Sequence, residues 1–171
     1  MNNHNYDEMQ AWAKHKDGTY VALEMQDDSK RELDEFITGH LSLNERTDPN
    51  EYHITVTYST MPVPYAEKYK KQNPNIFCRA NAIGYDLFTT KDGGKCLVLR
   101  VDCTLAELIN KDMSLNGATS NYPEYHPHIT ICYNYTGDSD VSNLPIPDFH
   151  IFFDELTVKP LDLEFVPDNK S

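Results

Sequence analysis

The chain has 171 residues, of which 39% are hydrophobic and 25% charged, which suits a single globular domain spanning residues 1–171. Its formal charge is −12 and its longest basic run is the pair Lys70–Lys71. Long nucleic acid, which is held mainly by neutralising phosphates, is therefore excluded as a partner. No apolar run approaches the roughly 20 residues of a membrane span and no signal peptide opens the chain, so we expect a cytoplasmic protein without membrane contacts.

In the first half of the chain, strand and helix patterns alternate. Residues 19–25 predict a strand, and residues 28–41 predict a helix because their apolar side chains recur at helical spacing. A second strand is predicted at 52–58. Residues 61–75 contain three prolines and a basic stretch with two tyrosines, so we expect a loop there, lying over a site.

The second half continues this alternation. It predicts strands at 76–89 and 95–102 joined by a turn at 92–94, a helix at 104–115, a strand at 128–135, and one strand or a pair of strands within 149–159. Each half places a helix before a strand that begins His-Ile-Thr. We therefore expect an α+β fold with two pseudo-repeat lobes, at about residues 17–60 and 95–135.

One six-residue pattern occurs twice, from His53 to Tyr58 and from His128 to Tyr133. Both copies read His-Ile-Thr, an aliphatic residue, a variable residue and tyrosine. Because side chains alternate along a strand, the histidine, the threonine and the fifth residue should share one face. The other three residues, including the tyrosine, should pack on the opposite face. The predicted catalytic residues are His53, Thr55, His128 and Thr130.

Two histidines suit the cleavage of a ribose phosphodiester. A neutral imidazole can take the proton of the 2′-hydroxyl, while a protonated imidazole gives a proton to the departing 5′-oxygen. The two threonine hydroxyls can donate to the non-bridging oxygens, where negative charge builds up. This chemistry needs no cofactor or metal ion, and the order of the chemistry suggests His53 as base and His128 as acid.

Other interpretations of the histidines remain open. A single His-x-Ser/Thr match is weak, because chance supplies one in a chain with seven histidines; His40–Ser42 is such a match, at a helix end. The two strand histidines could also be structural. A metal site formed by His126 and His128 with Glu124 or His53 is a further possibility.

With these motifs the chain resembles the two-histidine (2H) phosphoesterase superfamily, and within it the phage anti-CBASS nucleases, over roughly residues 15–162. The segments Tyr122 to Thr130, Tyr52 to Val56 and Phe153 to Glu155 carry this resemblance. It implies a duplicated 2H-phosphoesterase-like fold, with two lobes of mainly antiparallel sheet around a central groove and helices on the outside.

The resemblance also implies an activity and its substrate. The expected enzyme is a hydrolase that cleaves cyclic di- and trinucleotide defence signals, such as 3′,3′-cGAMP and cyclic triadenylate, at 3′–5′ bonds, letting a phage evade CBASS immunity. It would act in the bacterial cytoplasm as a monomer or weak homo-oligomer. Tyr20 and Glu155 would bind substrate. The family's base-stacking tryptophan has no counterpart, so Tyr65, Tyr69 or Phe165 is expected to stack instead.

Three other functions fit the residues. A 2H phosphoesterase could act on 2′,3′-cyclic phosphates, 2′–5′ oligoadenylate or RNA ends, and the sequence does not separate these substrates. A sponge could bind cyclic nucleotides without cutting them, although it would need no pair of proton-transferring histidines. A structural or interaction protein would bind no nucleotide at all.

Overall fold

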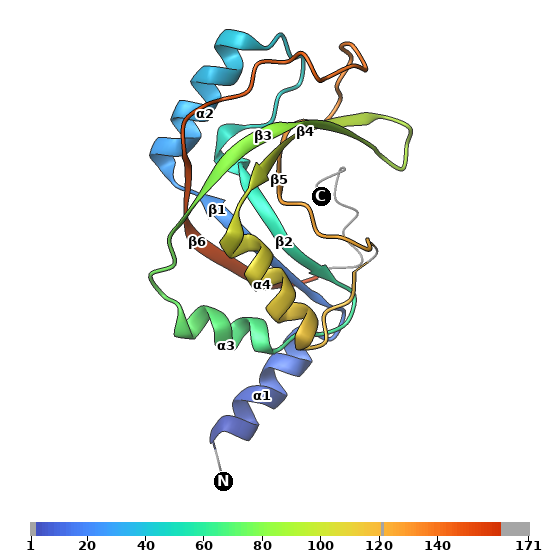
Figure 1. Ribbon diagram of the computed structural model, residues 1–171. Coiled ribbons are helices and arrows are strands. Elements are labelled where there is room, and N and C mark those ends of the chain that lie inside the picture. The colour runs from blue at the N-terminus through green and yellow to red at the C-terminus, as the bar shows by residue number, and fades with distance from the viewer. Residues whose placement is uncertain (1–2, 121, 162–171) are drawn as a thin grey trace.

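The computed structural model describes residues 3–120 and 122–161 (Figure 1). The helices are α1 (Asn3–Lys14), α2 (Asp27–His40), α3 (Tyr65–Gln72) and α4 (Thr104–Leu115), with a 3-10 turn, η1 (Pro49–Glu51). The strands are β1 (Thr19–Met25), β2 (His53–Ser59), β3 (Cys78–Thr89), β4 (Lys95–Asp102), β5 (His128–Cys132) and β6 (Ile151–Pro160). None of these helices is long and apolar enough to cross a bilayer.

The six strands form one antiparallel sheet in the order β2-β1-β6-β3-β4-β5. This α+β arrangement confirms the predicted fold class. The two strands that carry the His-Ile-Thr pattern stand at opposite ends of this order, and yet β2 and β5 contact each other. Strand twist accumulates across a sheet, and here the sheet curls until its two edges meet (Figure 1). Motifs from the two halves of the chain thereby come together.

Helices cover one face of the curled sheet. In α2, Leu33 and Ile37 are completely or almost completely buried, as their spacing predicts. The buried residues of α4 are Ala106, Ile109 and Met113. Their partners are the alternate strand residues Leu23, Ile54, Leu99 and Ile129 of the same core. Because these strand residues face the helices, the residues that alternate with them lie on the opposite face of the sheet, where polar side chains can stand.

Two expectations for local structure were wrong. Residues 61–75 hold the helix α3 rather than a continuous loop. Pro62 and Pro64 precede this helix, where a missing N–H costs nothing, so the prolines mark its start instead of excluding it. Ala66 is buried and α3 contacts β6, so α3 packs on the sheet face that the other helices cover. It does not lie over the opposite face, which carries the two histidines. The strand expected at 128–135 ends at Cys132.

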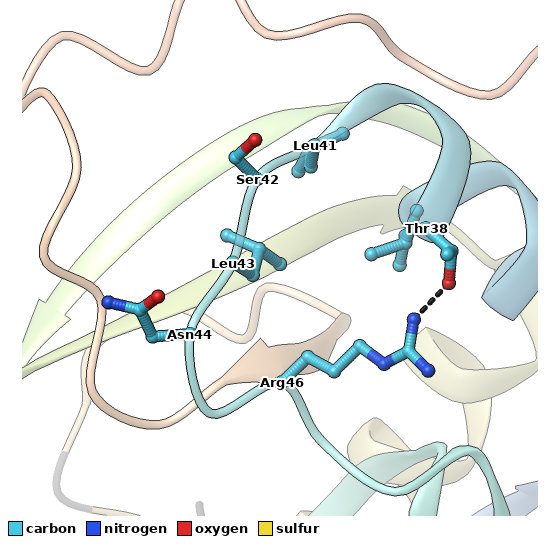
Figure 2. A pocket seen from close by; sticks show the side chains of 7 residues that line it. Thr38, Leu41, Ser42, Leu43, Asn44 and Arg46 are labelled. Carbon is cyan, nitrogen blue, oxygen red and sulfur yellow. Dashed lines mark hydrogen bonds between the residues drawn. The ribbon is translucent and has the colours of Figure 1, made fainter.

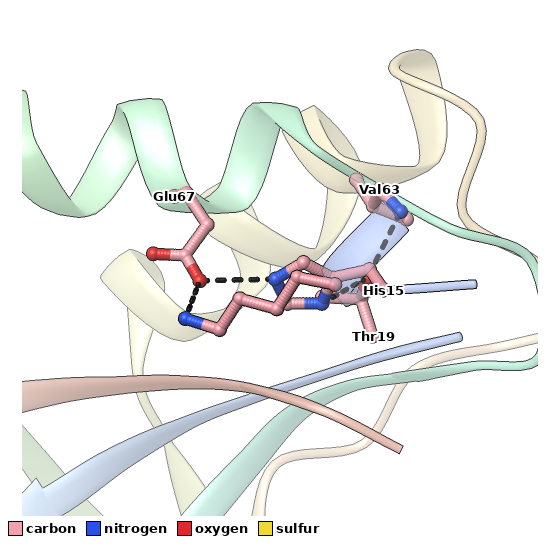
Figure 3. Close-up of polar contacts among 5 residues, drawn as sticks. His15, Thr19, Val63 and Glu67 are labelled. Carbon is pink, nitrogen blue, oxygen red and sulfur yellow. Dashed lines mark hydrogen bonds and ion pairs between the residues drawn. The ribbon is translucent and has the colours of Figure 1, made fainter. Parts of the chain in front are cut away.

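The most deeply buried histidine, His15, has a structural role (Figure 3). The amide of Val63 donates to Thr19 Oγ1 at 2.9 Å, and the Thr19 hydroxyl is hydrogen-bonded to His15 Nδ1 at 3.1 Å. His15 Nε2 then donates to Glu67 Oε1 at 2.9 Å. This chain of hydrogen bonds ties the end of α1 to β1 and α3, so His15 serves the scaffold and not the chemistry.

Candidate active site

Each His-Ile-Thr strand contains a β-bulge at the same motif position. The extra residue is Val56 in β2 and Ile131 in β5. A bulge shifts the alternation of side chains by one residue. Thr57 therefore turns into the core and is 4% exposed, while Tyr58 is 45% exposed. The predicted alternation was wrong beyond each bulge, because a simple strand period cannot include the extra residue.

The register of β2, β1 and β6 orders the first half of the site in three rows. Partners across antiparallel strands point to the same side of the sheet. The rows are His53, Glu24 and Glu155; then Thr55, Ala22 and Thr157; then Tyr58, Tyr20 and Lys159. The four predicted residues of this half, two catalytic and two substrate-binding, thus stand on one face of neighbouring strands.

The second half repeats the arrangement on β5, β4 and β3. The rows are His128, Arg100 and Gly84; then Thr130, Val98 and Asp86. Phe88 packs edge-on against the His128 ring, with 5.0 Å between centroids. His128 is partly exposed and Thr130 is buried, so each half presents one reachable imidazole beside one threonine hydroxyl.

The two imidazoles are held in the same way. The Nδ1–H of His53 donates to the carbonyl of Glu51 at 2.7 Å, and that of His128 donates to the carbonyl of His126 at 2.9 Å. A carbonyl can only accept, so these bonds assign the proton to Nδ1 in both neutral rings. Proton exchange with a substrate would then take place at Nε2 of each ring.

The electrostatics of His128 link the two halves. Burial lowers the pKa of His128 below its ordinary value of 6.5, and the bond to the His126 carbonyl opposes this shift. The charge of His53 lowers the pKa further, while that of Asp86 raises it. Because β2 and β5 contact each other, the strands that carry the two imidazoles meet, and a positive charge on His53 opposes protonation of His128.

Each bulge is held by the opposite half of the chain. The carbonyl of Val56 accepts from Asn110 Nδ2 of α4 at 2.7 Å. The carbonyl of Ile131 accepts from the amide of Thr47 at 2.9 Å. A bulge leaves backbone groups without partners in the neighbouring strand. Here these groups bond to the opposite lobe: the bulge of β2 to the second half of the chain, and the bulge of β5 to the first half.

Tyr125 adds a direct link between the motifs. Its hydroxyl donates to the carbonyl of Thr55 at 2.8 Å, and it stands three residues before His128. The side-chain hydroxyl of Thr55 lies 3.3 Å from that of Tyr20. The carbonyl and the hydroxyl of Thr55 are therefore held, one from each half of the chain.

Removing the Tyr125 hydroxyl should disturb the site more than the fold. We expect Tyr125→Phe to lower the free energy of unfolding by about 1 kcal/mol, one net hydrogen bond. It should also lower kcat by about 3- to 10-fold, because Thr55 loses its alignment with His128. The matched control is Tyr135→Phe, which removes a tyrosine–carbonyl bond of 2.9 Å to Asp138 in a surface turn. Equal kcat values for the two variants in steady-state assays would show that Tyr125 does not position the site.

Several other residues considered from the sequence lie outside this arrangement. Tyr65 and Tyr69 belong to α3 and pack against the core, and the Tyr65 hydroxyl donates to Asp112 at 2.6 Å. Phe165 lies outside the described residues. His126 pairs with Glu124 at 3.4 Å. Within residues 3–120 and 122–161, no group of three His, Cys, Asp or Glu side chains is placed to hold a metal ion.

A pocket of about 420 Å³ lies at the C-terminal end of α2 (Figure 2), and neither His53 nor His128 lines it. It is lined by Ile37, Thr38, Leu41, Ser42, Leu43, Asn44 and Arg46. The Arg46 guanidinium donates to Thr38 and pairs with Asp34 at 3.5 Å. Arg46 also forms an isolated antiparallel β-bridge with Cys132, the last residue of β5. This pocket thus belongs to the segment that fastens the first half of the chain to the second.

Comparison with known protein families identifies the family of this chain. The family model described as anti-CBASS protein Acb1 matches residues 17–168. The chain belongs to the anti-CBASS protein Acb1 family. One Acb1 relative, from Vibrio phage KVP40, is 30% identical over 154 residues, covering 89% of this chain and 93% of the relative. Another, from Enterobacteria phage T4, is 28% identical over 153 residues, covering 90% and 94%.

Solved structures confirm the fold of this Acb1 family member. The protein TT0787 of Thermus thermophilus matches with a TM-score of 0.57 at 12% identity, covering 82% of this chain and 86% of that one. E. coli LigT complexed with NADP+ matches with a TM-score of 0.53 at 16% identity, covering 82% and 85%. Family and fold together make the chain a phage anti-CBASS phosphodiesterase with a 2H phosphoesterase fold, as its motifs predict.

Proposed function

We propose that this chain opens cyclic di- and trinucleotide defence signals at a 3′–5′ bond, with His53, Thr55, His128 and Thr130 as its catalytic residues. The observation that carries the proposal is the matched pair of Nδ1-anchored imidazoles, which come from the two ends of one curled sheet. Tyr20 and Glu155, on the rows of Tyr58 and His53, would hold the nucleotide. The enzyme would work in the host cytoplasm as a monomer or weak homo-oligomer.

The proposed reaction has two steps. One imidazole accepts at Nε2 the proton of a ribose 2′-hydroxyl, whose oxygen attacks the adjacent phosphorus. The other imidazole, protonated, gives its Nε2 proton to the departing 5′-oxygen, and a 2′,3′-cyclic phosphate results. In the second step the histidines exchange roles, and water opens this cyclic phosphate to leave a linear product with a 3′-phosphate. The hydroxyls of Thr55 and Thr130 would donate to the non-bridging oxygens in both steps.

Two cations stand beside these residues in an otherwise acidic chain. Arg100 is the cross-strand partner of His128, and Lys159 is that of Tyr20. Both lie on the sheet face of the proposed catalytic residues. They suit the phosphates of a small cyclic nucleotide, whereas the net charge of −12 opposes binding to a long polyanion.

The lowered pKa of His128 bears on which histidine is the base. A lowered pKa favours the neutral imidazole at neutral pH, and only a neutral imidazole accepts a proton. We therefore propose His128 as base and His53 as acid for the opening step, the reverse of the assignment that the order of the chemistry suggests.

This assignment predicts the pH dependence of kcat/KM. Activity should fall with acid only as His128 becomes protonated, so the acidic limb should lie below pH 6.5, the ordinary histidine value. The alkaline limb should follow loss of the proton that the general acid carries. Stopped assays of ring opening across the pH range would measure both limbs. An acidic limb at or above pH 6.5 would contradict the role proposed for His128.

The substrate class is tested by incubating the purified protein with a panel in excess chelator. The panel holds 3′,3′-cGAMP, cyclic triadenylate, 2′–5′ oligoadenylate and an RNA ending in a 2′,3′-cyclic phosphate. We expect the cyclic oligonucleotides to be opened fastest. Preferential cutting of the linear substrates would favour a different 2H phosphoesterase, and recovery of bound but uncut rings would favour a sponge.

A further inference from the structure

The two β-bulges have a further effect, on the tyrosine that ends each motif. Because Val56 is the extra residue of β2, Tyr58 becomes the cross-strand partner of Tyr20 and joins the face of His53 and Thr55. Its side chain is 45% exposed. An unbroken strand would have packed Tyr58 with Ile54 in the core. The bulge thus places a large aromatic ring beside the candidate active site, where core packing does not require one.

The second tyrosine belongs to the other half of the chain. Tyr133 follows β5 directly, after the bulge at Ile131, and is partly exposed. Burial raises the pKa of Tyr133 to about 12, so its phenol is neutral at ordinary pH. The Tyr133 carbonyl accepts from Cys96 Sγ at 3.5 Å, and Cys96 is the cross-strand partner of Phe88, whose ring packs against His128. Tyr133 therefore lies one row beyond Thr130 on the second half of the candidate active site.

Tyr20 itself is already engaged on both its ring and its hydroxyl. Lys159 Nζ lies over the Tyr20 ring, 5.0 Å from the centroid. The Tyr20 hydroxyl shares a hydrogen bond with Thr55. These contacts suit Tyr20 to orienting Thr55 and leave the neighbouring ring of Tyr58 as the better surface for a planar ligand.

We propose that Tyr58 and Tyr133 are the aromatic contacts for the two nucleobases that flank the scissile phosphate, with purines preferred. This inference rests on the proposed function, since it assigns a nucleotide to the candidate active site. Bases stack on aromatic side chains with little dependence on sequence, and larger purine rings offer more contact area. One tyrosine from each half also fits a substrate with one base on either side of the bond that is cut.

The test measures binding separately from cleavage. The probe is 3′,3′-cGAMP lacking both ribose 2′-hydroxyls, which the proposed reaction cannot cut, and its Kd is measured by calorimetry. Tyr58→Ala and Tyr133→Leu should each raise Kd by roughly 5- to 100-fold, the range expected for one lost stacking contact. Tyr58→Phe and Tyr133→Phe should keep Kd close to wild type, because phenylalanine retains the ring. Trp12→Ala, an exposed aromatic of α1, is the control and should leave Kd unchanged.

Three results would overturn the inference: a Kd within twofold of wild type in Tyr58→Ala and Tyr133→Leu, an equal loss in the phenylalanine variants, or no binding by the wild-type protein. Melting temperatures show that each variant is folded, and Tyr133→Leu retains apolar volume for this purpose. Cleavage of intact 3′,3′-cGAMP by wild type is measured alongside. Binding without cleavage would refute the proposed function while still testing the two tyrosines.

Discussion

His53→Ala and His128→Ala should each reduce ring opening of 3′,3′-cGAMP by about 10²- to 10⁴-fold, the usual contribution of one positioned proton transfer. Each imidazole is anchored through Nδ1 to a backbone carbonyl, so proton exchange with substrate is expected at Nε2. Both imidazoles are partly exposed, so truncating them should change the melting temperature little. Single-turnover rates at saturating enzyme measure the loss directly.

His40→Ala is the matched control for these variants. His40 is anchored in the same manner, with Nδ1 2.9 Å from the carbonyl of Phe36, and it also begins a His-x-Ser match. It lies exposed in the last turn of α2, as expected of a chance match. Its removal should leave cleavage unchanged. Near-normal cleavage by either His53→Ala or His128→Ala would refute the two-histidine mechanism.

The second large effect is expected at the threonines. Thr55→Val and Thr130→Val should each lower kcat by about 10²- to 10³-fold, the loss typical of one donor to a developing oxyanion. Valine keeps the shape of threonine, so KM should change less than kcat if the hydroxyl acts mainly in the transition state. Steady-state kinetics with 3′,3′-cGAMP separate the two parameters.

Thr57→Val controls for the loss of a threonine hydroxyl from the same strand. Thr57 Oγ1 is buried without a hydrogen-bond partner, because the bulge at Val56 turns it into the core. Its replacement should leave kcat unchanged and should keep or raise the melting temperature. A loss in Thr57→Val as large as in Thr55→Val would mean that β2 responds to any change and that Thr55 has no special role.

Much of this arrangement could be predicted from the sequence. Amphipathic spacing identifies α2 and α4, and the duplicated His-Ile-Thr pattern selects the strands that meet. The bulges could not be predicted from the sequence, because a strand pattern assumes that side chains alternate at every residue. The inserted residue, Val56 or Ile131, is an ordinary strand residue and does not mark a bulge. The recurrence of tyrosine at the sixth position in both copies was the available clue that this residue has a role outside the core.

The contacts that join the two halves were beyond sequence reasoning. Asn110 and Tyr125 hold the carbonyls of Val56 and Thr55, and nothing in their local sequence marks them as donors to a distant edge strand. Their partners become known only when the curl of the sheet is known. Similarly, α3 was missed because prolines before a helix and prolines in a loop give the same local signal.

Attack by the substrate's own ribose hydroxyl, under the control of two histidines, can be tested with a matched pair of cyclic dinucleotides. The protein is incubated in excess chelator with 3′,3′-cGAMP and with its counterpart lacking both 2′-hydroxyls, and products are identified by mass spectrometry. We expect only the ribose ring to be opened, through a transient 2′,3′-cyclic phosphate to a linear 3′-phosphate. Cleavage of the deoxyribose ring, or a product ending in a 5′-phosphate, would contradict it.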